Sequence, residues 1–198
     1  LFGLRNTGCE LSINNLVESL RSVGYRTSWA TINEAIRLFC QAHLLELLSD
    51  YTVSLSPDST ATDKVYAVDP GMAYAVSRAN QQDVGKRLET VVHGELQRRF
   101  ALSRVDAITS YTAPKTKKKV DFLVGDALGT DPYELVQVTV DITAEKTRRR
   151  EIGSLVEAMT ATQVRSGTVV TLREMGHAEG EYGVISIVPA WKWALLVD

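Results

Sequence analysis

Cysteine is scarce in this chain of 198 residues, and its two cysteines, Cys9 and Cys40, lie far apart. They lack the spacing of a zinc site, so we expect two buried thiols in a reducing cytoplasm. The three histidines, His43, His93 and His177, have no mutual spacing that suggests a metal site or a catalytic dyad. No serine lies in a nucleophile motif either. These absences argue against a zinc-stabilised fold and against acyl transfer by a nucleophilic serine.

Long hydrophobic runs are also absent. No apolar run approaches the roughly 18 residues that a membrane span needs, and the start lacks the pattern of a signal peptide. The chain begins without methionine, so we expect it to be a fragment of a longer protein. A hydrophobic content of 44% and a charged content of 23% are ordinary for a globular protein. We therefore expect a cytoplasmic protein with no membrane partner.

An excess of positive charge is missing as well. A net charge of −2 argues against a protein that coats nucleic acid by charge alone. Basic residues nevertheless gather in two runs, at 115–119 and 146–150, which taken singly are more often solvated faces than binding sites. Both runs flank the candidate site described below. We therefore expect contacts with nucleic-acid phosphates from a set of four residues, Lys117, Lys118, Arg148 and Arg149.

Residues 1–69 are predicted to form a winged helix-turn-helix. Apolar spacing predicts a helix over 11–20 with Ser12 as N-cap, and a second helix over 28–43 capped by Thr27 or Ser28. Two strands, at 51–55 and 64–68, are predicted to form a hairpin. Helix, longer helix and two-stranded wing is the order of that motif.

The charge of this module disfavours DNA binding. Four arginines stand against five carboxylates up to Asp50, while phosphate neutralisation supplies most non-specific affinity. A packing or partner-docking module is therefore an equal alternative. If the module does bind DNA, Arg26, Ser28 and Thr31 at the start of the second helix would face it.

Residues 70–198 are predicted to form a layered α/β domain, with Asp69-Pro70-Gly71 as the boundary. A short helix over 72–78 and a long helix over 84–100 precede the strands. The predicted strands cover 105–111, 119–124, 134–141, 167–172 and 183–188, with a crossover helix over 145–162 and a last helix near Pro189. A leading helix, a three-stranded meander and a crossover helix indicate a mixed-sheet fold of the α/β (α+β) class.

Two of these strands carry a polar residue within an apolar alternation. Counting by two places Val120, Phe122 and Val124 on one side and Asp121 on the other. In the neighbouring strand Gln137 projects on the same side as Thr139. Restriction-endonuclease-like folds place an acid and an acid or amide around a divalent metal in this way.

Oxygen ligands of this kind suit Mg²⁺, which would polarise a phosphate and activate the attacking water. We expect Glu89, Asp121 and Gln137 to hold it, with Glu89 supplied by the long helix. The alternatives are an exposed helix carboxylate for Glu89 and a simple pair with Lys119 for Asp121. The lysine of the usual Asp…(Glu/Gln)-x-Lys pattern is replaced by Thr139. Lys119 is our hypothesis for a migrated cation, which makes Asp121, Gln137 and Lys119 the catalytic candidates.

Several strings appear in the order found in one family. They lie at 64–71, 85–96, 119–122, 137–139, 150–152 and 187–193. With them the chain resembles the C-terminal region of a prokaryotic family of AAA-type ATPases. That resemblance implies an N-terminal ATP-binding module followed by a winged helix and a PD-(D/E)XK nuclease-like domain of unknown function. Such domains in this family often lack the full catalytic set.

The ATP-binding string Gly-x4-Gly-Lys-(Ser/Thr) does not occur here, so ATP would bind only in a missing N-terminal module. The resemblance implies that module as a partner, with nucleic acid as a further candidate partner and self-association left open. Our expectation is a nucleic-acid-associated, nuclease-like effector region with weak or no cleavage. The rivals are a non-catalytic interaction module and DNA binding through the winged helix.

Overall fold

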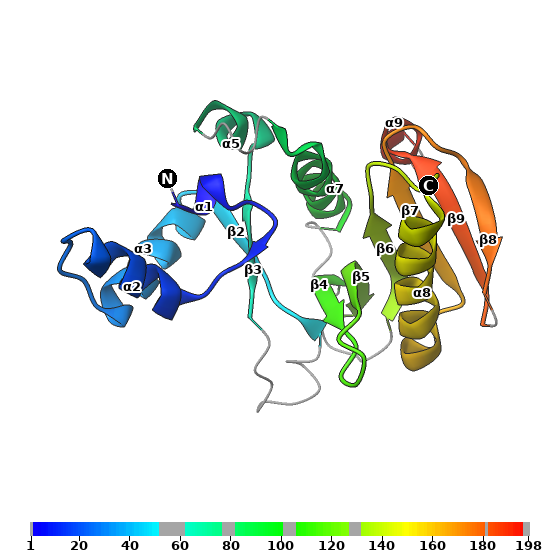
Figure 1. Cartoon of the computed structure of the whole chain (residues 1–198), viewed down its shortest axis with the longest axis horizontal. Coiled ribbons are helices and arrows are strands. Elements are labelled where there is room, and N and C mark those ends of the chain that lie inside the picture. Colours follow the sequence, from blue (N-terminus) through cyan, green and yellow to red (C-terminus); the bar gives the residue numbers. More distant parts are fainter. Residues whose placement is uncertain are drawn as a thin grey trace.

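The computed structural model describes residues 2–51, 62–76, 82–100, 106–126, 132–180 and 182–195. Over these residues the chain is a mixed α/β protein with two sheets, one of three strands and one of six. Within the same residues no helix has both the length and the apolar character to cross a membrane. Along the long axis the six-stranded sheet lies toward one end and the three-stranded sheet lies near the middle, with helix α7 (Val84–Phe100) between the two sheets (Figure 1).

The N-terminal unit alternates short helices and strands. Its elements are α1 (Phe2–Arg5), β1 (Cys9–Glu10), α2 (Ile13–Ser22), α3 (Trp29–Gln41), β2 (Leu45–Leu48) and β3 (Lys64–Ala67). The two predicted helices and their caps are confirmed. Ser12 accepts a hydrogen bond from the Asn15 N–H and Ser28 accepts one from the Thr31 N–H, which satisfies donors that the first turn leaves free.

The predicted partner of strand β3 is wrong. β3 lies in the middle of the order β1-β3-β2, and its antiparallel neighbour is Leu45–Leu48 rather than 51–55. The Leu44–Leu48 run is rich in leucine and carries no alternation, so the sequence favoured the end of a helical unit. Burial decides otherwise, because Leu45 packs into one core and Leu48 into another. Residues 52–61 lie outside the described part of the chain.

The six-stranded sheet follows two further helices, α5 (Pro70–Val76) and α7 (Val84–Phe100). Its order is β4-β5-β6-β7-β9-β8. The strands and remaining helices are β4 (Asp106–Thr112), β5 (Lys119–Asp126), β6 (Pro132–Val138), α8 (Glu145–Thr162), β7 (Ser166–Thr171), β8 (Gly176–Glu179), β9 (Val184–Pro189) and α9 (Ala190–Leu195). β4, β5 and β6 form an antiparallel meander, and α8 then crosses over so that β7 runs parallel to β6. The predicted meander and crossover are confirmed, while the edge strand β8 was not predicted.

Helices cover both faces of this sheet. Leu155, Ala158 and Met159 of α8 pack with Leu135 and Val169 on one face. On the other face Val92 and Leu96 of α7 pack with residues of β5, β6 and β7, namely Phe122, Val136 and Val170. Figure 1 shows α8 running along the sheet, with α7 beside β5 and β6.

Strand β3 contributes to both units. Val65 packs with Leu11, Ile36 and Leu45 in the N-terminal core. Its neighbour Tyr66 is fully buried in the other core, with Val92 of α7 and Phe122 of β5. Because successive strand residues point to opposite faces, one strand joins the two cores. The domain boundary between residues 69 and 70 stays a prediction. β3 precedes that boundary, yet its Tyr66 packs in the core of the unit that follows it.

A β-bulge in β5 corrects the predicted strand parity. Thr109 pairs with Leu123 and Tyr111 pairs with Val120, so two residues of β5 lie opposite one residue of β4. Val120 therefore packs in the α8 core while Phe122 packs in the α7 core, although counting by two placed them on one face. Asp121 is one of the two β5 residues in the bulge, so the bulge changes the direction of its side chain.

Candidate functional site

Two carboxylates from different elements meet around one amine. The Lys64 Nζ of β3 lies 2.9 Å from Glu89 Oε1 of α7 and 3.1 Å from Asp121 Oδ1 of β5. The exposed fractions of the three side chains are 12%, 16% and 15% in that order, so water screens them little. The predicted pair Glu89 and Asp121 is thus brought together, and Lys64 lies between the two.

Charge and burial oppose each other in this cluster. Burial alone would lower the pKa of Lys64, but the carboxylates of Asp121 and Glu89 more than offset it and raise that pKa. Burial, followed by the charge of Asp121, raises the pKa of Glu89. Tyr66 donates its hydroxyl to Glu89 Oε1 at 2.6 Å, which satisfies a further lone pair of the carboxylate. The cluster thus sets two acidic side chains against one basic side chain.

Gln137 lies beside Asp121 without touching its carboxylate. Its Oε1 accepts the backbone N–H of Asp121 at 3.3 Å, and its Nε2 donates to Glu151 Oε2 of α8 at 2.8 Å. The second oxygen of Asp121 accepts the N–H of Val138 at 3.0 Å. These contacts hold Asp121 and Gln137 at the end of the β5–β6 pair. The oxygen expected to face a metal is committed to the backbone.

The predicted magnesium site does not fit these residues as they are arranged. The donor set has the oxygen chemistry that Mg²⁺ prefers, but the ammonium of Lys64 fills the space between the two carboxylates. Among the described residues no group of three or more His, Cys, Asp or Glu side chains is placed to hold a metal ion. Any metal at this place requires Lys64 to leave it.

The two residues discussed for the missing lysine lie elsewhere. The Thr139 hydroxyl donates to the Asp141 carbonyl at 3.1 Å. Lys119 is half-exposed and forms an ion pair with Glu10 of β1, away from Asp121. The cation that reaches the carboxylates is Lys64 instead. The role of Lys119 as a migrated cation stays a prediction, and the bulge and the position of β3 bring the amine of Lys64 to the carboxylates.

A cavity of about 450 Å³ opens beside the cluster. Its lining includes the acidic and polar side chains Glu89, Asp121, Gln137 and Glu151 and the basic side chains Lys117, Lys118, Lys119 and Arg150. Lys118 also pairs with Glu157 at 3.2 Å, and Arg150 pairs with Glu151. Three lysines of the run at 115–119, Lys117, Lys118 and Lys119, therefore line the cavity beside the carboxylates.

The arginines of the second basic run, at 146–150, lie in different places. Arg150 lines the same cavity, whereas the side chain of Arg149 is 80% exposed and pairs with Glu145 at 2.7 Å. Arg148 lines a different cavity of about 440 Å³ beside Glu174 and His177. Successive helix residues point in different directions, so only one of three neighbouring arginines reaches the site. Of the four residues predicted to contact phosphates, Lys117 and Lys118 line this cavity, whereas Arg148 and Arg149 do not.

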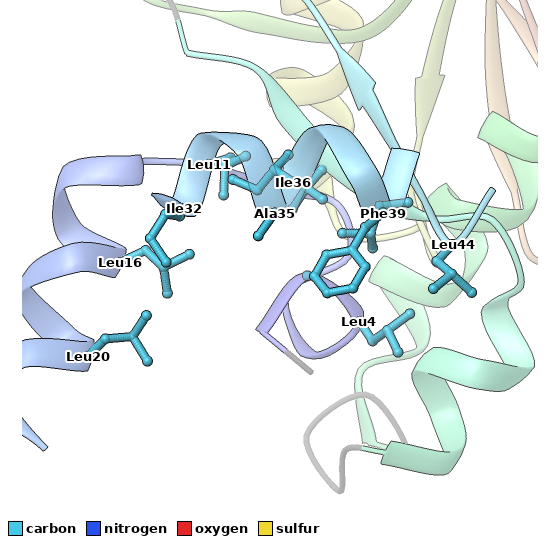
Figure 2. A pocket seen from close by; sticks show the side chains of 12 residues that line it. Leu4, Leu11, Leu16, Leu20, Ile32, Ala35, Ile36, Phe39 and Leu44 are labelled. Atoms are coloured by element: carbon cyan, nitrogen blue, oxygen red, sulfur yellow. The ribbon is translucent and has the colours of Figure 1, made fainter. Parts of the chain in front are cut away.

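An apolar cavity of about 230 Å³ lies within the N-terminal unit. Leu16 and Leu20 of α2 and Ile32 and Phe39 of α3 point into it (Figure 2). It is separate from the acidic cluster and carries no titratable side chain. We assign no chemistry to it.

Comparisons with protein-family models, curated proteins and solved structures found no match.

Sequence reasoning missed Lys64, Tyr66 and Glu151. Lys64 and Tyr66 alternate with buried Val65, which reads as an ordinary hairpin strand. Glu151 is a buried carboxylate on α8, 4% exposed, within a helix whose neighbouring charges are exposed. A signal existed only for Glu151, since it shares the apolar face with Leu155 and Ala158 at helical spacing.

Proposed function

We propose that this chain is a nucleic-acid-associated region with a nuclease-like fold in which phosphodiester cleavage is weak or absent. The observation that carries the proposal is the meeting of Glu89 and Asp121 beside Gln137, at a cavity lined by three consecutive lysines. A helix, a bulged strand and its neighbour supply these groups, which is the arrangement expected of a restriction-endonuclease-like site. Thr139 at the lysine position and Lys64 between the carboxylates both disfavour catalysis.

The resemblance to AAA-type ATPases extends this proposal to a partner. The region would act as the effector or targeting end of an ATPase module in the same protein. The lysines at the cavity mouth would contact a nucleic-acid backbone, because ammonium groups neutralise phosphates and release counterions. Phosphate contact of this kind needs no base recognition.

A second candidate function concerns the N-terminal unit. Its order, α1-β1-α2-α3-β2-β3 with a β1-β3-β2 sheet, supports the proposal of a winged helix. Helix α3 would be its recognition helix, yet it exposes Trp29, Leu38 and Phe39 at 51%, 50% and 43%. Exposed aromatic and aliphatic side chains favour contact with a protein over contact with DNA phosphates. We therefore propose that this unit is a docking module whose protein partner belongs to the assembly formed with the ATPase module.

Binding of labelled single- and double-stranded DNA, measured by fluorescence anisotropy over a range of salt, tests the first function. We expect affinity to fall as salt rises, and to fall further in the double variant Lys117→Glu/Lys118→Glu. Arg165→Glu is the matched control, because exposed Arg165 directly precedes β7, at the end of that strand away from Gln137. Equal loss in both variants, or no binding by the wild type, would exclude the cavity as a phosphate-contacting surface.

A plasmid-nicking assay with Mg²⁺ tests the enzymatic part. We expect no nicking above background by the wild-type chain. Nicking that Asp121→Ala abolishes would contradict the proposal and make the chain an active nuclease.

A further inference from the structure

The amine of Lys64 occupies the centre of the acidic cluster. It donates hydrogen bonds to one oxygen of Glu89 and one of Asp121, at 2.9 and 3.1 Å, from a side chain that is 12% exposed. Two part-buried carboxylates facing one another need a positive partner, since like charges in a poorly hydrated place repel strongly. Lys64 supplies that charge from within the chain.

The position of Lys64 is fixed by its strand. Lys64 pairs with Glu10 of β1 on one side and with Leu48 of β2 on the other. The following residues, Val65 and Tyr66, are buried in the two different cores. The backbone that carries the amine is therefore held on both edges and both faces. The N-terminal unit delivers the amine, while Glu89 and Asp121 belong to the unit with the larger sheet.

Other contacts close the same place. Tyr66 donates to Glu89, and a Cβ on Gly8, which has φ +72°, would lie 3.4 Å from Glu89 Oε2. The segment before β1 therefore lies close to the second carboxylate oxygen. Thr7 Oγ1 lies 2.9 Å from Thr90 Oγ1, one residue after Glu89, and ties that segment to α7. The carboxylate is enclosed by the N-terminal unit on more than one side.

We propose that Lys64 is the resident cation of this site and excludes divalent metal from it, so that the N-terminal unit holds the site closed. This inference rests on the proposed function, because it concerns the regulation of the same carboxylates. A divalent ion needs carboxylate oxygens at about 2.0 to 2.6 Å, whereas Glu89 Oε1 and Asp121 Oδ1 already accept from the Lys64 ammonium, whose positive charge repels a second cation. Metal and Lys64 are therefore mutually exclusive, and the site accepts metal only when the amine is withdrawn.

The test measures Mn²⁺ binding to the full chain without nucleic acid, with electron paramagnetic resonance detecting the free ion. Wild type is expected to bind Mn²⁺ only weakly, with no stoichiometric binding at this site. Lys64→Met keeps the length of the stem and removes the charge, and it is expected to bind one Mn²⁺ at least about tenfold more tightly than wild type. The double variant Lys64→Met/Asp121→Asn is expected to lose that binding. Lys119→Met is the matched control, because it removes a lysine of adjacent β5 that pairs with Glu10.

Thermal unfolding supplies a second measurement. We expect Mn²⁺ or Mg²⁺ to raise the melting temperature of Lys64→Met and to leave that of wild type unchanged, since only a folded site binds the ion. Lys64→Gln serves if Lys64→Met does not fold, because its amide can still donate to a carboxylate.

Three results would overturn the inference. One is stoichiometric Mn²⁺ binding by wild type that Asp121→Asn abolishes, which needs no Lys64 variant. Another is a folded Lys64 variant that binds no more Mn²⁺ than wild type. The third is an equal gain in Lys119→Met. Failure of DNA binding with a gain of Mn²⁺ in Lys64→Met would sink the proposed nucleic-acid function and leave this inference standing.

Discussion

His93 is a buried histidine with one ring nitrogen that has no hydrogen-bond partner among the described residues. Its imidazole stacks on Tyr66 with ring centroids 4.1 Å apart, and Nε2 is the unpartnered atom. Burial, and then the charge of Lys64, lower the pKa of His93 from 6.5 to about 4. The folded protein therefore keeps this ring neutral over a range in which the unfolded chain binds a proton.

The sign of the pH effect follows from this difference. Between pH 6.5 and about 4 the unfolded state takes up a proton that the folded state refuses. Stability contributed by the neutral ring is complete above the upper value and is lost as the pH falls toward the lower one. At about 1.36 kcal/mol for each pKa unit, the loss is about 3 kcal/mol. This is an upper figure, because Glu46 Oε2 lies 3.5 Å from Nδ1 and favours the charged ring.

Urea unfolding at a series of pH values from about 7.5 to 4, followed by circular dichroism, measures the effect. We expect His93→Phe to lose about 3 kcal/mol less than wild type over this range, whatever its stability at neutral pH. Carboxylates that do not contact His93 contribute equally to both proteins and cancel in the comparison, and Glu46 is the one described carboxylate that pairs with the ring. Exposed His177→Phe is the control and should follow wild type. Parallel curves for His93→Phe and wild type would refute the reasoning.

Two further predictions concern contacts near and far from the site. Tyr66→Phe removes the 2.6 Å hydrogen bond to Glu89 and should lower the free energy of unfolding by about 2 kcal/mol. Exposed Tyr25→Phe is the control and should leave that free energy unchanged. Equal values for the two variants would show that the bond contributes nothing to stability. Gly183→Ala places a Cβ 1.9 Å from the Arg165 carbonyl oxygen and should cost about 3 kcal/mol or more in urea unfolding. Gly94→Ala, where a Cβ meets nothing within 4 Å, should be neutral or stabilising, and a similar loss in both would contradict this account.

The sequence by itself determined the regular elements that its local patterns specify. Helices α7 and α8 have the predicted bounds, because long apolar stripes with period 3.6 leave little choice of structure. Ser12 and Ser28 cap their helices as expected, since a side-chain oxygen needs only the next turn as its partner. The sequence order also predicted that Glu89, Asp121 and Gln137 lie near one another, and the structure brings Glu89 and Asp121 to one lysine while their role as a site stays a prediction.

Tertiary structure decided everything that depends on a partner distant in the chain. Leu45–Leu48 became a strand because β3 pairs with it, and β8 is a short edge strand because β9 offers a free edge. The bulge at Asp121 depends on the register with β4, which no pattern within β5 encodes. Lys64 is the clearest case. Its own sequence predicts a solvated strand residue, and only the packing of β3 against α7 and β5 brings its amine between two carboxylates.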